Sequence, residues 1–200
     1  SHLVLRLFPW AFLFLLPQNV EAGCSFCAAG FYCDAALPAV PDGGIRCGVD
    51  GVIAETYYGT YSSLEKALQY MDINTLPIPY GVNCLNVDAM GFYLAEKYHA
   101  AFLQIDSVVG HVKPRDEETL QAFFDVMRPR YDGYVLGGVR FKYQPVMSVK
   151  TLAEDLATAR QRCDGVCVTQ ERTGQETSVE KIEEFRRDLG DFPLIVAAGT

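Results

Sequence analysis

The sequence lacks an excess of basic residues. Its 200 residues include 17 Lys and Arg against 25 Asp and Glu, which gives a formal net charge of −8. The basic residues are scattered along the chain and form no basic stripe that would offset this charge. Nucleic-acid binding depends on a basic surface that faces the phosphates. The composition therefore argues against nucleic acid as a partner.

The seven cysteines do not complete a metal site or a single disulfide framework. Cys24 and Cys27 have the spacing of half a zinc site, but the second CxxC or histidine pair is missing. We therefore predict neither a metal nor another cofactor. Cys84, Cys163 and Cys167 lie in or beside apolar runs, as buried thiols of a reduced protein do. This usage favours an intracellular protein over a secreted one, and the residues do not decide the compartment.

The sequence also has no long uninterrupted apolar run. Residues 3–16 are strongly apolar, but Arg6 and Pro9 interrupt them, and the run is too short for a membrane span. The run weakly resembles the apolar region of a secretory signal. Membrane association is expected only through it or through a partner complex. We assign residues 1–45 to an atypical, Cys-rich segment, and one hypothesis is that it is foreign to the fold that follows.

From residue 46 onward, short apolar runs alternate with segments of helical periodicity. The runs with strand character are residues 51–55, 78–85, 101–109, 134–141, 165–169 and 192–198. Five helical segments separate them, and Asp116 is a candidate N-cap for the third. Three other helices are expected to begin at pairs with capping-box spacing. These pairs are Ser62 and Glu65, Thr151 and Glu154, and Thr177 and Glu180.

This alternation predicts an α/β protein with a parallel sheet, because runs apolar at nearly every position are typical of strands covered on both faces. A doubly wound sheet fits the pattern. A (β/α)8 barrel fits better, because polar residues occur at the carboxyl end of strand after strand, where such barrels carry their chemistry. A full barrel needs about 250 residues. We therefore expect residues 46–200 to form a partial barrel of about six units, with the first and last units missing or replaced.

Four stretches carry a resemblance to a known family. They read GVDGVIAE at 48–55, PYGVNCLNVD at 79–88, FLQID at 102–106, and DGVCVT at 164–169, the last leading to Thr173 and Gly174. In order and spacing they resemble the BtpA-like family, a group within the ribulose-phosphate-binding barrels, over residues 46–200. The resemblance implies a TIM barrel. Family members are described as photosystem I biogenesis factors or as enzymes of nucleosidase or phosphoribosyl type. Gln170 departs from the glycine that the family usually has there.

Several residues are candidates for binding a phosphorylated ligand. Thr173 and Gly174 precede a predicted helix whose free N–H groups favour an anion, and Gly199 is expected at the adjacent strand end. The alternative is a plain turn. Arg140 and Lys142 share a strand face by the period of two and could hold a phosphate or carboxylate. Alternatively, one of them forms a structural ion pair with Glu55 or Asp106. Three further strand-end or helix-start residues complete the predicted binding set: Asn83, Asp88 and Thr169.

Two carboxylates are the candidate catalytic residues. Glu55 ends an apolar strand, where burial raises a carboxyl pKa and favours a general base. The alternative is that Glu55 is a structural partner of Lys142. Asp106 could form an acid–base pair with His111, although a solvated loop histidine is the commoner case.

Three functions remain open from the sequence. The first is an enzyme that binds a phosphorylated sugar or nucleoside at the carboxyl mouth of the barrel and cleaves a glycosidic bond or transfers a phosphoribosyl group. The second is a non-catalytic assembly or stability factor of the photosystem I biogenesis type. The third is an incomplete, non-functional fragment.

Overall fold

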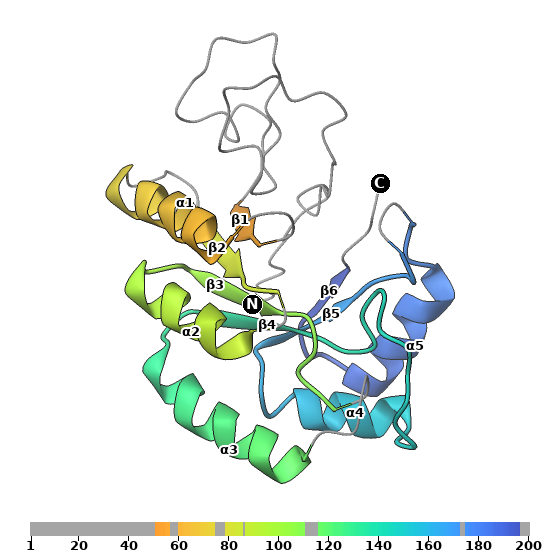
Figure 1. Ribbon diagram of the computed structural model, residues 1–200. Helices are drawn as coiled ribbons and strands as arrows, with labels where there is room; N and C mark the ends of the chain where they lie inside the picture. The colour runs from red at the N-terminus through yellow and green to blue at the C-terminus, as the bar shows by residue number, and fades with distance from the viewer. Residues whose placement is uncertain are drawn as a thin grey trace, which may run out of the picture.

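The computed structural model describes residues 51–56, 60–74, 79–85, 87–110, 116–172 and 175–196. Within these ranges, six strands alternate with five α-helices (Figure 1). The strands are β1 Val52–Glu55, β2 Tyr80–Asn83, β3 Phe102–Ile105, β4 Tyr134–Gly138, β5 Gly165–Val168 and β6 Leu194–Val196. The helices are α1 Tyr61–Asn74, α2 Asp88–Lys97, α3 Glu117–Met127, α4 Leu152–Ala159 and α5 Val179–Leu189, with a 3-10 turn at Arg128–Arg130 after α3.

The six strands form one sheet in which every neighbouring pair is parallel. Their order in the sheet is their order in the chain, β1-β2-β3-β4-β5-β6. A doubly wound sheet reverses its strand order at one point, and these six strands show no such reversal. The predicted parallel α/β architecture is confirmed. Closure of the sheet into a barrel stays a prediction.

All five helices pack on the same face of the sheet. Alternate strand residues, including Ala54, Val82, Leu103, Val135 and Val166, belong to one apolar cluster with side chains from each of α1 to α5. Figure 1 shows the helices following one another along this side. Sequential parallel strands joined by right-handed crossovers place their helices in this way.

The opposite face carries a smaller apolar cluster. Phe102, Leu136, Cys167 and Ile195 come from four neighbouring strands, and Phe141 joins them. Side chains two residues apart on a strand lie on the same face. The polar residues Gln104 and Asp106 therefore continue the face of Phe102 towards the carboxyl ends of the strands.

The predicted N-caps agree with the structure for α3 and α4, and they differ from it for α1 and α5. Asp116 caps α3, and Thr151 with Glu154 forms the predicted capping box of α4. For α5, the N-cap is Ser178 rather than Thr177, and its hydroxyl accepts from Lys181 N–H at 3.3 Å. The Thr177 side chain is buried instead.

The predicted start of α1 is also shifted. Thr60, rather than Ser62, caps its first turn and accepts from Ser63 N–H at 3.2 Å. In both α1 and α5 several hydroxyl residues stand in succession, and sequence spacing alone does not select among them.

The segment assigned to residues 1–45 lies outside the described residues. In the part of the chain that the structure describes, no helix is both long and apolar enough to cross a membrane.

Candidate active site

Polar side chains meet at the carboxyl ends of β1, β2 and β3. The sheet register places Glu55 opposite Asn83 and Asn83 opposite Gln104. The three residues therefore form a row across neighbouring strands and point to the same face. Asp106 follows two residues after Gln104, just beyond the end of β3. The register thus places Glu55, Asn83 and Asp106, all of them predicted site residues, at the ends of neighbouring strands.

Hydrogen bonds join the members of this row. Asn83 Nδ2 donates to Asp106 Oδ1 at 3.0 Å and approaches Glu55 Oε2 at 3.4 Å. Gln104 Nε2 donates to Asp106 Oδ1 at 3.2 Å. Glu55, Asn83 and Gln104 are all buried. The amide of Asn83 thus lies between two carboxyl groups and holds both in place.

Burial raises the pKa of both carboxyl groups. The pKa of Glu55 is raised to about 7, first by burial and then by the neighbouring Asp106 charge, against the opposing effects of Lys142 and Asn83. Burial also raises the pKa of Asp106, while the amides of Asn83 and Gln104 and the charge of Lys142 lower it. A carboxyl group with a pKa near 7 can both donate and accept a proton at neutral pH.

The charge of Lys142 lowers the pKa of both carboxyl groups. Burial lowers the pKa of the Lys142 ammonium group, and the charges of Glu55 and Asp106 raise it. Its backbone N–H donates to Thr169 Oγ1 at 2.7 Å, so the residue after β5 anchors the segment that carries it. The predicted residues Lys142 and Thr169 are therefore in contact through the backbone.

The expectation that Arg140 and Lys142 share a strand face is wrong. β4 ends at Gly138 rather than at Phe141, and Arg140 has a φ of 49°. This left-handed conformation breaks the two-residue alternation of a strand. Arg140 Nε donates to the buried carboxylate of Asp155 at 3.1 Å, and Nη2 donates to Lys150 O at 2.9 Å. Arg140 therefore serves a structural ion pair on α4.

Arg140 also lines a hollow on the helix side of the sheet. This hollow has a volume of about 640 Å³. It lies among the 140–146 segment, Leu152 of α4 and several residues of α5, including Lys181 and Phe185. None of Glu55, Asn83, Asp106 or Lys142 lines it. Arg140 and Lys142, predicted from the sequence to line one pocket, therefore lie in different surroundings: Arg140 lines the hollow and Lys142 does not.

Of the remaining predicted residues, the structure describes Asp88. Asp88 is the first residue of α2, and its charge adds to burial in raising the pKa of Cys84 to about 11. The hydrogen bonds among Glu55, Asn83 and Asp106 are made without it. Thr173, Gly174, Gly199 and His111 lie outside the described residues, as do Cys24 and Cys27. Among the residues that are described, no group of three or more His, Cys, Asp or Glu side chains is placed to hold a metal ion.

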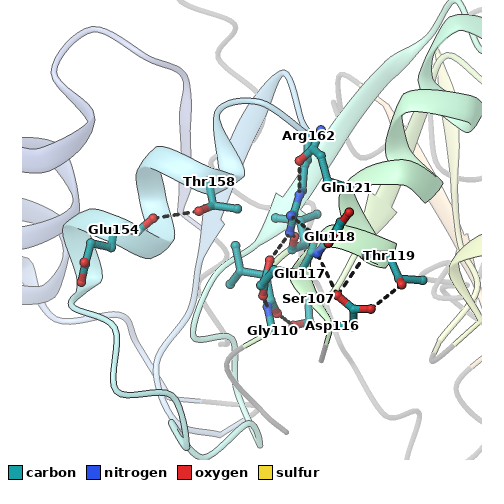
Figure 2. A network of polar contacts seen from close by, with 12 residues as sticks. Ser107, Gly110, Asp116, Glu117, Glu118, Thr119, Gln121, Glu154, Thr158 and Arg162 are labelled. Carbon is teal, nitrogen blue, oxygen red and sulfur yellow. Dashed lines mark hydrogen bonds and ion pairs between the residues drawn. The ribbon is translucent and has the colours of Figure 1, made fainter. Parts of the chain in front are cut away.

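The segment after Asp106 is held by a buried arginine (Figure 2). Arg162 is 2% exposed, and its Nη1 donates to Val108 O at 2.9 Å. The same group forms an ion pair with Glu117 of α3 at 2.8 Å. Glu117 in turn accepts from Gly110 N–H at 2.6 Å. These contacts hold the backbone that follows Asp106, at residues 108–110, against the start of α3.

Gly138 holds the same segment from the other side. A Cβ at this position would collide with the Asp106 carbonyl oxygen, and Gly138 O accepts from Val108 N–H at 3.1 Å. The exit of β3 therefore lies directly against β4.

Sequence reasoning did not predict site roles for Gln104 or Arg162. Gln104 had a usable signal, since it is a polar residue in a strand that is otherwise buried and apolar, two positions before Asp106. Arg162 had none, because its partners Val108 and Glu117 lie 54 and 45 residues away in the chain.

Neither the models of known protein families nor the sequences of curated proteins match this chain.

Proposed function

We propose that this chain is an enzyme that acts on a phosphorylated sugar or nucleoside at the carboxyl mouth of a partial (β/α)8 barrel, as its resemblance to the BtpA-like family implies. One observation carries the proposal. The carboxyl groups of Glu55, which is buried, and Asp106, which is half-buried, are joined by Asn83, and the charge of Lys142 lowers the pKa of both. Buried charges are costly unless they are paired, so a cluster of this kind is common where chemistry is done.

The arrangement suits cleavage of a glycosidic bond. Two carboxyl groups beside one sugar are the usual machinery of that reaction. Protonated Glu55 donates its proton to the leaving base as the bond to the anomeric carbon breaks. A water molecule adds to that carbon and gives its proton to a carboxylate, and the products are the free base and the sugar phosphate. Asp106 stabilises the positive charge that develops on the sugar ring, while Lys142 limits the negative charge of the pair.

The phosphate group is assigned to the region before α5. Thr177 Oγ1 is buried there and has no hydrogen-bond partner among the described residues. The N-terminus of α5 adds free N–H groups and the positive end of the helix dipole. The predicted residues Thr173, Gly174 and Gly199 complete this part of the proposal.

Ligand binding and turnover test the proposal together. We expect ribose 5-phosphate to bind the wild-type chain in calorimetry, and Lys142→Met to weaken binding about tenfold or more through loss of a charged partner. Lys66→Met, on the exposed side of α1, is the matched control and should bind as wild type.

Release of free base from nucleoside 5′-monophosphates, followed by chromatography, measures the reaction. Glu55→Gln and Asp106→Asn should each slow it about 100-fold or more. Absence of both ribose 5-phosphate binding and base release in the wild-type chain would refute the enzyme proposal.

A non-catalytic assembly factor is the second candidate. It is favoured by the segment after β4, where Val146, Met147 and Val149 are exposed apolar side chains. Exposed apolar groups close together are a feature of interaction surfaces. This candidate predicts that ribose 5-phosphate does not bind in calorimetry and that Glu55→Gln keeps the assembly function.

A further inference from the structure

Gln104 carries a fully buried acceptor that no described residue bonds. The side chain is 2% exposed, and its Nε2 donates to Asp106 Oδ1. Its Oε1 is buried and has no hydrogen-bond partner within the described ranges. Leaving a buried acceptor unpaired is costly, and such a group in a native fold calls for an explanation.

The orientation of the amide is set by its neighbours. Turning it over would place Oε1 against Asp106 Oδ1, so that two acceptors would face each other, and the donated bond at 3.2 Å would be lost. Asn83 Nδ2, the other amide donor of the row, is already engaged with Asp106 and Glu55. The open acceptor therefore requires a donor from outside the row.

We propose that Gln104 Oε1 accepts a hydrogen bond from the 2-hydroxyl of a ribosyl ligand, and that Gln104 thereby selects ribose over 2-deoxyribose. The inference rests on the proposed function, which places the anomeric carbon beside Glu55 and Asp106. The 2-hydroxyl is on the carbon next to the anomeric carbon. The Gln104 amide donates a hydrogen bond to Asp106. Its unpaired oxygen is therefore next to the carboxylate that the proposed function places beside the anomeric carbon.

The chemistry of the row supports a hydroxyl as the donor. A hydroxyl is neutral and can fill the open acceptor without adding charge to a buried site that already holds Glu55, Asp106 and Lys142. Hydrogen bonds to the 2-hydroxyl also strengthen as the sugar approaches the transition state of glycosidic cleavage. A site built to bond a hydroxyl rejects the analogue that lacks it, because the acceptor is then left unpaired.

Calorimetric titration of the full chain with ribose 5-phosphate and 2-deoxyribose 5-phosphate tests this assignment. We expect the wild-type chain to bind the ribose compound about tenfold or more tightly than the deoxy compound. Gln104→Met keeps the length of the side chain and removes the acceptor, so its ratio of the two affinities should fall to about one. Gln161→Met, on the exposed turn after α4, is the matched control and should keep the wild-type ratio.

The outcomes separate this inference from the proposed function. Equal binding of both sugars by the wild-type chain would overturn the role of Gln104 and leave the enzyme proposal standing. A preference for ribose that survives in Gln104→Met would do the same. No binding of either sugar would overturn the inference about Gln104, and absence of base release as well would overturn the proposed function. Thermal unfolding monitors whether Gln104→Met folds, and equal binding of both sugars by the wild-type chain would overturn the role of Gln104 even if this variant does not fold.

Discussion

Glu55 ties the protonation of the site to the stability of the fold. Its carboxyl pKa is 4.5 in an unperturbed chain and about 7 in the folded protein, chiefly because of burial. Between these values the folded state keeps a proton that the unfolded state releases. The stability associated with this group is therefore complete below pH 4.5 and is lost as the pH rises through 7.

This linkage predicts a pH-dependent effect of Glu55→Gln. The wild-type chain should lose about 3 kcal/mol of unfolding free energy relative to the variant between pH 4.5 and pH 8. Urea unfolding at a series of pH values measures the difference. Glu183→Gln on the exposed face of α5 controls for the change in net charge. A constant difference between wild type and Glu55→Gln over this range would contradict the raised pKa.

At the scale of elements, the buried guanidinium group of Arg162 holds the connection from β3 to α3. Arg162 precedes β5, yet it reaches Val108 after β3 and Glu117 and Gln121 of α3. Its guanidinium also lies over the Phe124 ring at 5.7 Å. A buried ion pair adds little net stability when it is compared with an apolar pair of the same shape. Removing Arg162 is costly, because the carbonyl oxygens of Val108 and Glu117 lose their donor and the buried Oε2 of Glu117 loses its cation, although the Glu117 side chain as a whole is 30% exposed.

Arg162→Leu is therefore expected to lower the unfolding free energy by about 3–5 kcal/mol. Natural domains have only about 5–15 kcal/mol in total, so the variant should be partly unfolded under mild conditions. Arg160→Leu is the matched control, because Arg160 is exposed and its guanidinium donates to Leu189 O at 3.5 Å and lies over the Phe192 ring at 5.3 Å, with no ion pair to any of the described residues. Chemical unfolding of the two variants measures the contrast. A loss of under about 1 kcal/mol in Arg162→Leu would show that the pair is not needed to hold the segment.

At the scale of the whole molecule, the sheet separates two apolar clusters of unequal size. Cys163 belongs to the large cluster on the helix side, and Cys167 belongs to the small cluster on the opposite face. Burial raises the pKa of Cys163 to about 12 and that of Cys167 well above its ordinary value. Neither thiol is therefore reactive in the folded state, because the thiolate is the nucleophile.

We expect Cys163 and Cys167 to react with iodoacetamide at the same slow rate, set by global unfolding. The reason is that the strands contribute alternate side chains to both clusters, so neither face opens without the other. Peptide mass spectrometry after timed labelling at pH 8 follows each thiol separately. Labelling of Cys167 about tenfold faster than that of Cys163 would show that the smaller cluster opens on its own.

The sequence by itself determined the alternation of strands and helices, the parallel sheet, and the carboxyl-end positions of Glu55, Asn83 and Asp106. These features follow from periodicity and from residues that end apolar runs, and both are local properties of the chain. The cap of α3 and the capping box of α4 were predictable for the same reason, since their partners are two or three residues apart.

Only the tertiary structure decided which side chains share an environment. The left-handed turn at Arg140 sent its guanidinium to Asp155, while the charge of Lys142 acts on the two carboxyl groups. The open acceptor of Gln104 and the buried contacts of Arg162 likewise depend on segments that meet only in the folded sheet. Sequence spacing sets which residues are neighbours within a helix or strand. The partners across this fold are set by register and packing, which bring together residues 28 and 54 positions apart.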